Sequence, residues 1–334
     1  MTRKHNIKLQ TIIPFVAFAV IFLFFTIASK GRMVTARNIG ILIDQSMVIM
    51  LIGSGMLFVV AQGSIDLSVG VNLALSGVIG MWVALATGVH ILLIPVSLIV
   101  GAIVGLFNGT LVSKLKVPSF VLTIALLIGV RGIVLMLQTK IGTQYLPASL
   151  RILNEPYVKI PMFLVILAIM TYIFEFTKAG RYSQAIGENE TVAKFTGVPI
   201  NKMKILAFVL SGIMAGAGAI FSIITVGGTS QTMGSFTEMK TAMAIFLGGV
   251  LVTGGYSAKI YKMLLGSFSI TTIVNGLAII GYPETEVSES VEGVLLLLIL
   301  LVTMLSAERS RKREKAPSDK EPDEKAVEEA TSIK

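Results

Sequence analysis

Charged side chains are scarce over the first 306 residues of this sequence. Of its 334 residues 47 are charged, and 16 of those lie within 307–334. The preceding part therefore carries about one charge in ten residues, whereas roughly a quarter of the residues in an ordinary soluble domain are charged. Because such a chain cannot surround a large core with polar surface, we expect a polytopic membrane protein with a short charged tail.

Ten apolar runs are candidates for transmembrane helices, since about 20 apolar residues cross the ~30 Å hydrocarbon layer. Their apolar residues are continuous rather than alternating, which favours helices over barrel strands. The eighth run is short and begins among polar residues, so we expect it to be broken or re-entrant. The sequence predicts an all-α transmembrane bundle of about ten spans (8–10), at 11–28, 39–61, 67–87, 91–112, 119–138, 161–177, 204–226, 236–252, 263–281 and 291–306.

The distribution of lysine and arginine predicts that both termini are cytoplasmic. If the spans alternate from an inside N-terminus, 17 basic residues fall inside and 7 outside, leaving out Arg131 and three distal tail lysines. This asymmetry is typical of cytoplasmic loops. We therefore expect a cytoplasmic N-terminus at 1–10, a transmembrane domain at 11–306 with a cytoplasmic loop at 178–204, and a disordered cytoplasmic tail at 307–334. The first run is read as an uncleaved helix, not a signal peptide.

Several classes of function are excluded by composition. The sequence has no cysteine and two histidines, His5 and His90, so thiolate catalysis and cysteine or histidine metal sites are not expected. The net charge of +9 is explained by positive charge retained in the cytoplasm, not by nucleic acid. The basic cluster 309–315 is read as an anchor of the preceding helix end, and binding of membrane lipid is the alternative. The sequence has no phosphate loop ending in Gly-Lys-Ser/Thr, so we do not expect the chain to be an ATPase. The spans contain no paired catalytic carboxylates, Ser–His set or metal cluster, so we do not expect an intramembrane enzyme. We expect no metal and no cofactor.

The polar segment 178–204 contains a predicted short helix. Asn189 is a favourable N-cap, Glu190 suits the positive end of a helix, and Gly197 suits the position after its end. The helix of about seven residues would carry Val192 and Phe195 on one side. Such a helix either docks into a groove of another protein or lies on the membrane surface as a spacer.

A second distinctive segment, 62–70, joins the second and third runs. Gly63 permits a tight turn, and Asp66 or Ser68 can cap the following helix. A helix-breaking turn with a cap is the main interpretation, and a role in gating or passage of a solute is the alternative.

Polar residues inside the predicted spans are candidates for a transport path, because they are costly there. They are Asp44, Gln45, Asn72, Asn108, Arg131, Glu175 and Asn275. We expect Asp44 and Glu175 at the interface and Arg131 paired with a carboxylate or reaching toward water. Asn72, Asn108 and Asn275 either face a polar path or bond across helices. Small residues four apart, which let helices approach closely, predict packing within the chain rather than between subunits, at Gly101, Gly105, Gly109, Gly212 and Gly216. Sparse carboxylates argue against an ion-coupled secondary transporter.

Four segments resemble the permease subunits of bacterial ribose/xylose-type ABC importers. Residues 63–70, G-S-I-D-L-S-V-G, are similar to the family's G-G-I-D-L-S-V-G, and residues 185–204 resemble its A-x-G-x-N-x-x-A-A loop. Residues 238–255, with two Gly-Gly pairs, and Asn275-Gly276-Leu277 also match. The resemblance runs in order from about residue 10 to 306. The chain departs from the family after Gly255, with Tyr256, Lys259, Tyr261 and Lys262, and in the altered E-A-A core at 190–193.

The resemblance implies a bacterial cell-membrane permease for a monosaccharide (ribose-, xylose- or galactose-like). Nucleosides or a sugar-like signal molecule are the alternative cargoes, and an ion-coupled secondary transporter is the alternative mechanism. The implied partners are a cytoplasmic ATPase, a second permease subunit and an extracytoplasmic solute-binding protein. The implied ATPase-coupling residues are Gly187, Glu188, Asn189, Glu190, Thr191, Ala193, Phe195, Gly197 and Val198. The family signature and possible gate comprise Gly63, Asp66, Leu67, Ser68 and Gly70, and the possible translocation path comprises Asn72, Asn108 and Asn275.

Overall fold

The predicted all-α class is confirmed throughout the described part of the chain. The computed structural model describes residues 3–282 and, beyond them, positions 287, 289–291, 293–294, 297–298 and 301. Within these residues the regular structure is helical, and the extended pairing is confined to an isolated bridge between Tyr145 and Gly228. The predicted tail at 307–334 and most of the last run, 291–306, lie outside the described residues.

Within the described residues, seven helices are long and apolar enough to cross a membrane, and they coincide with seven of the ten predicted runs. They are α2 (Ala36–Ala61), α3 (Val69–Thr87), α4 (Leu93–Lys114), α5 (Ser119–Ile141), α6 (Pro156–Phe176), α9 (Ile200–Val226) and α11 (Ile260–Ile280). The first run lies in α1 (Arg3–Ala28), whose described apolar stretch, Pro14–Ala28, is shorter than a full span. The total of ten spans and the side of the membrane on which each terminus lies stay predictions.

The eighth run is broken, as its sequence indicates. Helix α10 (Thr237–Leu247) has 11 residues and is followed by an irregular segment that contains the short helix η4 (Gly255–Ser257). Gly249 has a φ of 86°, a conformation that favours glycine. At Gly248 the chain packs so closely on the Lys262 carbonyl that a Cβ would collide with it. These backbone requirements end the helix halfway.

The helices α2 and α9 form the centre of the bundle, and α4 packs directly on α9. In the most apolar stretch of each helix, 78% of the residues of α2 and of α9 are buried inside the protein, compared with 22% of those of α4. A Cβ at Gly101 would collide with the Gly212 carbonyl oxygen, and one at Gly216 with the Ser97 carbonyl oxygen. The small residues therefore bring two backbones into contact within one chain, which confirms the predicted intrachain packing.

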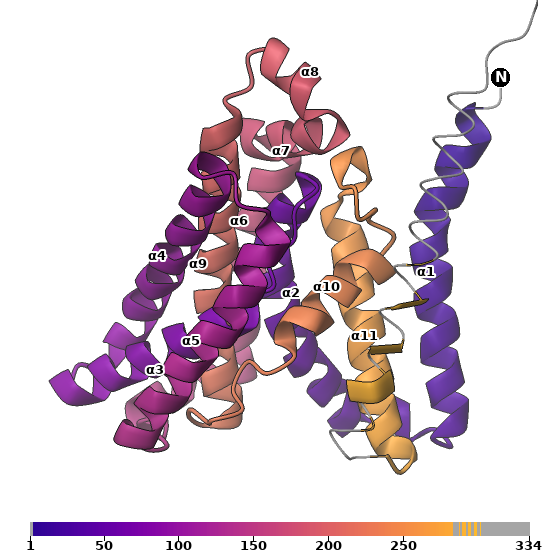
Figure 1. Ribbon diagram of the computed structural model, residues 1–334. Helices are drawn as coiled ribbons and strands as arrows, with labels where there is room; N and C mark the ends of the chain where they lie inside the picture. The colour runs from indigo at the N-terminus through magenta and orange to yellow at the C-terminus, as the bar shows by residue number, and fades with distance from the viewer. Residues whose placement is uncertain are drawn as a thin grey trace, which may run out of the picture.

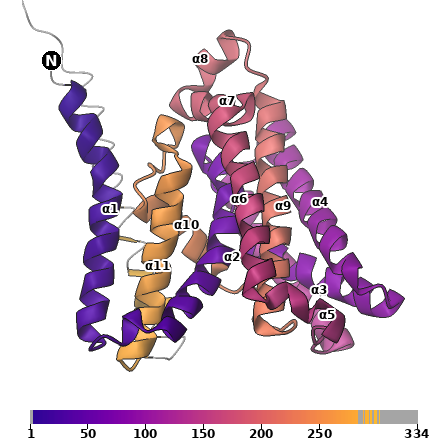
Figure 2. The ribbon, with the colours of Figure 1, turned by 180° about the vertical axis from the view of Figure 1, so that it is seen from behind.

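The molecule has two distinct ends. Helices α7 (Lys178–Glu188) and α8 (Glu190–Phe195) lie together at one end, which we name the loop end (Figures 1 and 2). The turn after α2 is at this end too, because Gln62 Nε2 donates to Ser183 Oγ and to the Met203 carbonyl, at 3.0 Å each. The opposite end, the far end, holds the connections 29–35, 88–92, 142–155 and 227–236.

Candidate functional site

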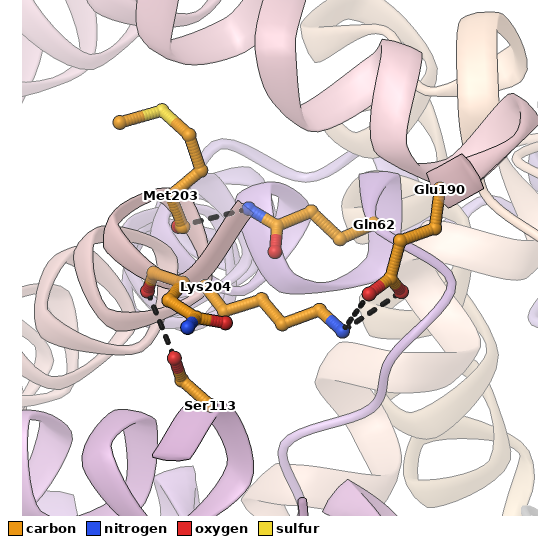
Figure 3. Close-up of polar contacts among 6 residues, drawn as sticks. Gln62, Ser113, Glu190, Met203 and Lys204 are labelled. Atoms are coloured by element: carbon orange, nitrogen blue, oxygen red, sulfur yellow. Dashed lines mark hydrogen bonds and ion pairs between the residues drawn. The ribbon is translucent and has the colours of Figure 1, made fainter. Parts of the chain in front are cut away.

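Helix α8 forms where the sequence predicts it. The Asn189 side chain caps it by accepting from the Val192 amide at 3.0 Å, and Gly197 follows its end with a φ of 83°. The Lys204 ammonium pairs with the Glu190 carboxylate at 2.8 Å and so ties the start of α8 to the start of α9 (Figure 3). In the same view, the Ser113 hydroxyl donates to the Asn201 carbonyl, which joins α4 to α9.

The two faces of α8 differ sharply. Val192 and Phe195 are exposed to 57% and 86%. On the other face Ala193 is buried, in one cluster with Ile186 of α7 and with Val198, which follows α8. The exposed phenyl ring is a large apolar group on a polar loop, and such groups act as anchors when a partner covers them.

Helix α7 was not predicted. Thr177 caps it, with its Oγ1 accepting from the Ala179 amide at 3.2 Å. One face of the helix is buried and carries Gly180, Ser183, Gln184 and Ile186. Thr177 and this amphipathic spacing were the available signals, and they are weak because two of the four buried residues are polar and one is glycine.

The C-terminal half of α7 holds the segment that follows the broken eighth run. The Glu188 carboxylate accepts from the Tyr256 amide at 2.8 Å, and Gln184 Nε2 donates to the Ala258 carbonyl at 2.9 Å. Gly187 packs so closely on the Ala61 carbonyl that a Cβ would collide with it. Helix α7 therefore fixes residues 254–258, which we name the 254–258 turn, beside the end of α2.

Asp66 lies at the centre of a buried polar network between the spans. Its Oδ1 accepts from the amide of Ser68 at 3.0 Å and from its hydroxyl at 2.6 Å, and its Oδ2 accepts from the Ser211 hydroxyl at 2.9 Å. Asn108 Nδ2 in turn donates to Ser68 Oγ at 2.8 Å. Burial raises the pKa of Asp66, and the hydrogen bonds from Ser68 and Ser211 oppose that rise. The predicted turn is confirmed, but the predicted cap is wrong, because Asp66 accepts from Ser68, which precedes the helix, and no side chain caps α3.

The rest of the signature and two of the predicted path residues serve packing in this structure. Leu67 is buried, and Gly70 faces the Glu238 carboxylate so closely that a Cβ would collide with it. Asn72 Nδ2 donates to the Gly101 carbonyl at 3.3 Å, so Asn72 and Asn108 both bond across helices. A role of either residue in a translocation path stays a prediction.

The other polar residues of the spans divide into paired and unpaired groups. Asp44 and Glu175 form ion pairs near the ends of their spans, with Lys159 at 2.7 Å and Lys259 at 3.3 Å. Arg131 Nη1 donates to the Met233 carbonyl at 2.8 Å, and it also interacts electrostatically with Glu238. Asn275 is buried, and its Oδ1 has no hydrogen-bond partner in the part of the chain that the structure describes.

A cavity of about 260 Å³ lies toward the far end, between α2, α9, α10 and α11. Its polar lining consists of Asp44, Gln45, Ser222, Thr225, Thr237, Lys240 and Thr271, and its apolar lining of Val48, Ile49, Val226 and Val274. The sequence singled out Asp44 and Gln45 as polar residues of a span. It gave no signal for the others, because serine and threonine are common in spans and only the fold brings these four helices together.

Comparison with known proteins identifies the family. Residues 38–301 match the family described as branched-chain amino acid transport system / permease component. The chain belongs to this family. It is 27% identical to the xylose transport system permease protein of Haemophilus influenzae (91% of this chain, 98% of that protein) and 29% identical to the ribose import permease protein of the same organism (80% and 84%). It is 30% identical to the autoinducer 2 import system permease protein of Enterobacter sp. strain 638 (83% and 81%).

These matches confirm the resemblance to ribose/xylose-type permease subunits. The chain is a permease component of a transport system and not itself an enzyme. Together with the seven candidate spans, they place it in the bacterial cell membrane as a multi-pass protein. No solved structure matches the chain.

Proposed function

We propose that this chain is the permease subunit of an ABC importer for a monosaccharide, powered by a separate ATPase that binds α8. The relatives named for xylose and ribose support a pentose as cargo. The relative named for autoinducer 2 supports a second candidate, a sugar-like signal molecule. The chain then supplies the path, and ATP hydrolysis on the partner supplies the energy.

The observation that carries the coupling role is the exposed pair Val192 and Phe195 on a helix held rigidly from behind. The helix is fixed by the Asn189 cap, by the ion pair of Glu190 with Lys204 and by the buried contacts of Ala193. A rigid helix that exposes an apolar anchor can dock into a groove without a large ordering cost. This favours docking over a spacer that lies on the membrane.

The distribution of basic residues supports a cytoplasmic loop end. Lysines and arginines gather there, and the acidic groups are few. These basic residues are Lys114, Lys116, Lys178, Arg181, Lys194, Lys202, Lys204, Lys259 and Lys262. With the loop end inside, the ATPase meets α8 in the cytoplasm and the cavity lies toward the outside. An extracytoplasmic binding protein would deliver cargo there, and a second permease subunit would complete the complex within the lipid.

Two substitutions test the coupling role. Glu190→Lys replaces the ion pair with Lys204 by two like charges. Gly197→Pro demands a φ near −65° where the chain has 83°. Both variants should insert normally but lose co-purification of the partner ATPase, while Glu155→Lys at the far end should retain it. Normal co-purification with both loop-end variants would overturn the role of α8.

The proposed cargo class is tested by uptake. Cells that depend on this importer should accumulate radiolabelled D-xylose or D-ribose, with autoinducer 2 as the second candidate. Accumulation of L-leucine without accumulation of either sugar or of autoinducer 2 would show that the chain follows the family's description rather than these relatives.

A further inference from the structure

The cavity at the far end has the chemistry of a binding site for a small molecule. We propose that it is a cargo subsite, in which a neutral polyhydroxylated molecule rests on its way through the permease. This inference rests on the proposed function and adds the place where the chain holds its cargo. The cavity volume of about 260 Å³ is near the lower bound of small-molecule pockets, roughly 300–1,000 Å³.

The lining matches a sugar on both its polar and its apolar faces. Ser222, Thr225, Thr237 and Thr271 bring hydroxyl groups from three helices. A hydroxyl group is both donor and acceptor, so it can pair with another hydroxyl in either direction. Thr271 Oγ1 donates to the Ser267 carbonyl at 2.7 Å, which leaves its lone pairs to accept from cargo. Aliphatic side chains on the other walls can cover the C–H face of a sugar ring.

The charges around the cavity favour a neutral cargo over an amino acid. Asp44 is paired with Lys159 at 2.7 Å, and the Lys159 side chain is 5% exposed. Lys240, the other charged residue of the lining, also has an interaction within the chain. The ammonium group of an α-amino acid is bound most strongly by a free carboxylate, and the carboxylate of this cavity is already neutralised by a buried partner. Hydroxyl groups need no such partner.

The position of the cavity connects it with the loop end. Thr237 and Lys240, in the first turn of α10, form one wall. Helix α10 continues into the 254–258 turn, which α7 holds through Glu188 and Gln184. A displacement of α7 by the ATPase would therefore pull on the chain that carries this wall. A subsite here can open or close with the power stroke.

The absence of cysteine permits a direct test, because any introduced thiol is the only one in the chain. In the full complex with ATPase and binding protein, Ser222→Cys is treated with N-ethylmaleimide in the presence of D-xylose, D-ribose, autoinducer 2 or L-leucine. Thr139→Cys on α5 is the control, since Thr139 is exposed near the far end and lies outside the cavity. Thr225→Cys repeats the test should Ser222→Cys fail to insert.

The transported sugar or autoinducer 2 should slow labelling of Ser222→Cys at least fivefold and leave labelling of Thr139→Cys unchanged. Alkylation of Ser222→Cys should reduce uptake at least tenfold relative to the same variant before treatment. Equal labelling with and without a molecule that the complex demonstrably transports would overturn the subsite alone. Protection by L-leucine would overturn the neutral cargo, and absence of all ATP-dependent uptake by the unsubstituted complex would overturn the proposed function instead.

Discussion

Truncation of Phe195 to alanine should weaken ATPase binding without affecting the fold. An aromatic side chain buries roughly 150–250 Å² when it is covered, and the 86% exposure of Phe195 leaves nearly all of it for a partner. If the substitution removes roughly 100 Å² of covered apolar surface, at ~25 cal/mol per Å² it costs about 2.5 kcal/mol. Since 1.4 kcal/mol is tenfold, Kd should rise about 60-fold.

The assay is equilibrium binding of the purified ATPase to the permease in nanodiscs. Phe107→Ala is the matched control, because Phe107 is 53% exposed but lies within the span α4 and not on α8. Both variants should have nearly the wild-type melting temperature, since exposed side chains contribute little to stability. A Kd for Phe195→Ala within about threefold of the wild-type value would refute the reasoning that α8 docks through this ring.

Three further predictions follow from the packing. Gln184→Ala removes a buried hydrogen bond to the 254–258 turn. The amount of solute imported per ATP hydrolysed should therefore fall, while the Kd for the ATPase stays within threefold of the wild-type value. An unchanged amount of solute per ATP would show that this hydrogen bond does not transmit the power stroke. Burial raises the pKa of Asp66 above its usual 3.8, so its stabilising contribution is full below that pH and is lost as pH rises through the folded pKa. The melting temperature of Asp66→Asn relative to wild type should therefore increase from pH 4 to pH 8, and a constant difference would contradict this. Gly101→Ala should lower the free energy of unfolding by about 1–3 kcal/mol, because its Cβ would meet the backbone of α9. Gly132→Ala on α5 should not lower it, because a Cβ there meets open space. Equal thermal stability of the two variants would contradict the close packing of α4 on α9.

The sequence predicted the parts of the fold that depend on local physics. Continuous apolar runs identified the seven candidate spans, because burial in lipid requires a helix of that length whatever its neighbours are. Helix α8 was located from Asn189 and Gly197, since a cap and a left-handed glycine act within one turn. The break after α10 was indicated by the shortness of the eighth run and by the polar residues at its start.

The missing parts depend on contacts between distant segments. Helix α7 is held by packing on α6 and by bonds to the 254–258 turn, so its own residues signal it weakly. The cavity requires α2, α9, α10 and α11 to meet, and no single run shows that. Asn72 illustrates the same limit, because an asparagine inside a span has the same sequence context whether it faces a path or bonds a neighbouring helix.

Uphill uptake in proteoliposomes distinguishes a permease driven by a partner from a carrier that powers itself. The purified chain alone, under proton or sodium gradients, should neither hydrolyse ATP nor concentrate D-xylose, D-ribose or autoinducer 2. Addition of the ATPase, the loaded binding protein and ATP should produce accumulation of the cargo above its external concentration. Gradient-driven accumulation by the chain alone would contradict the proposal.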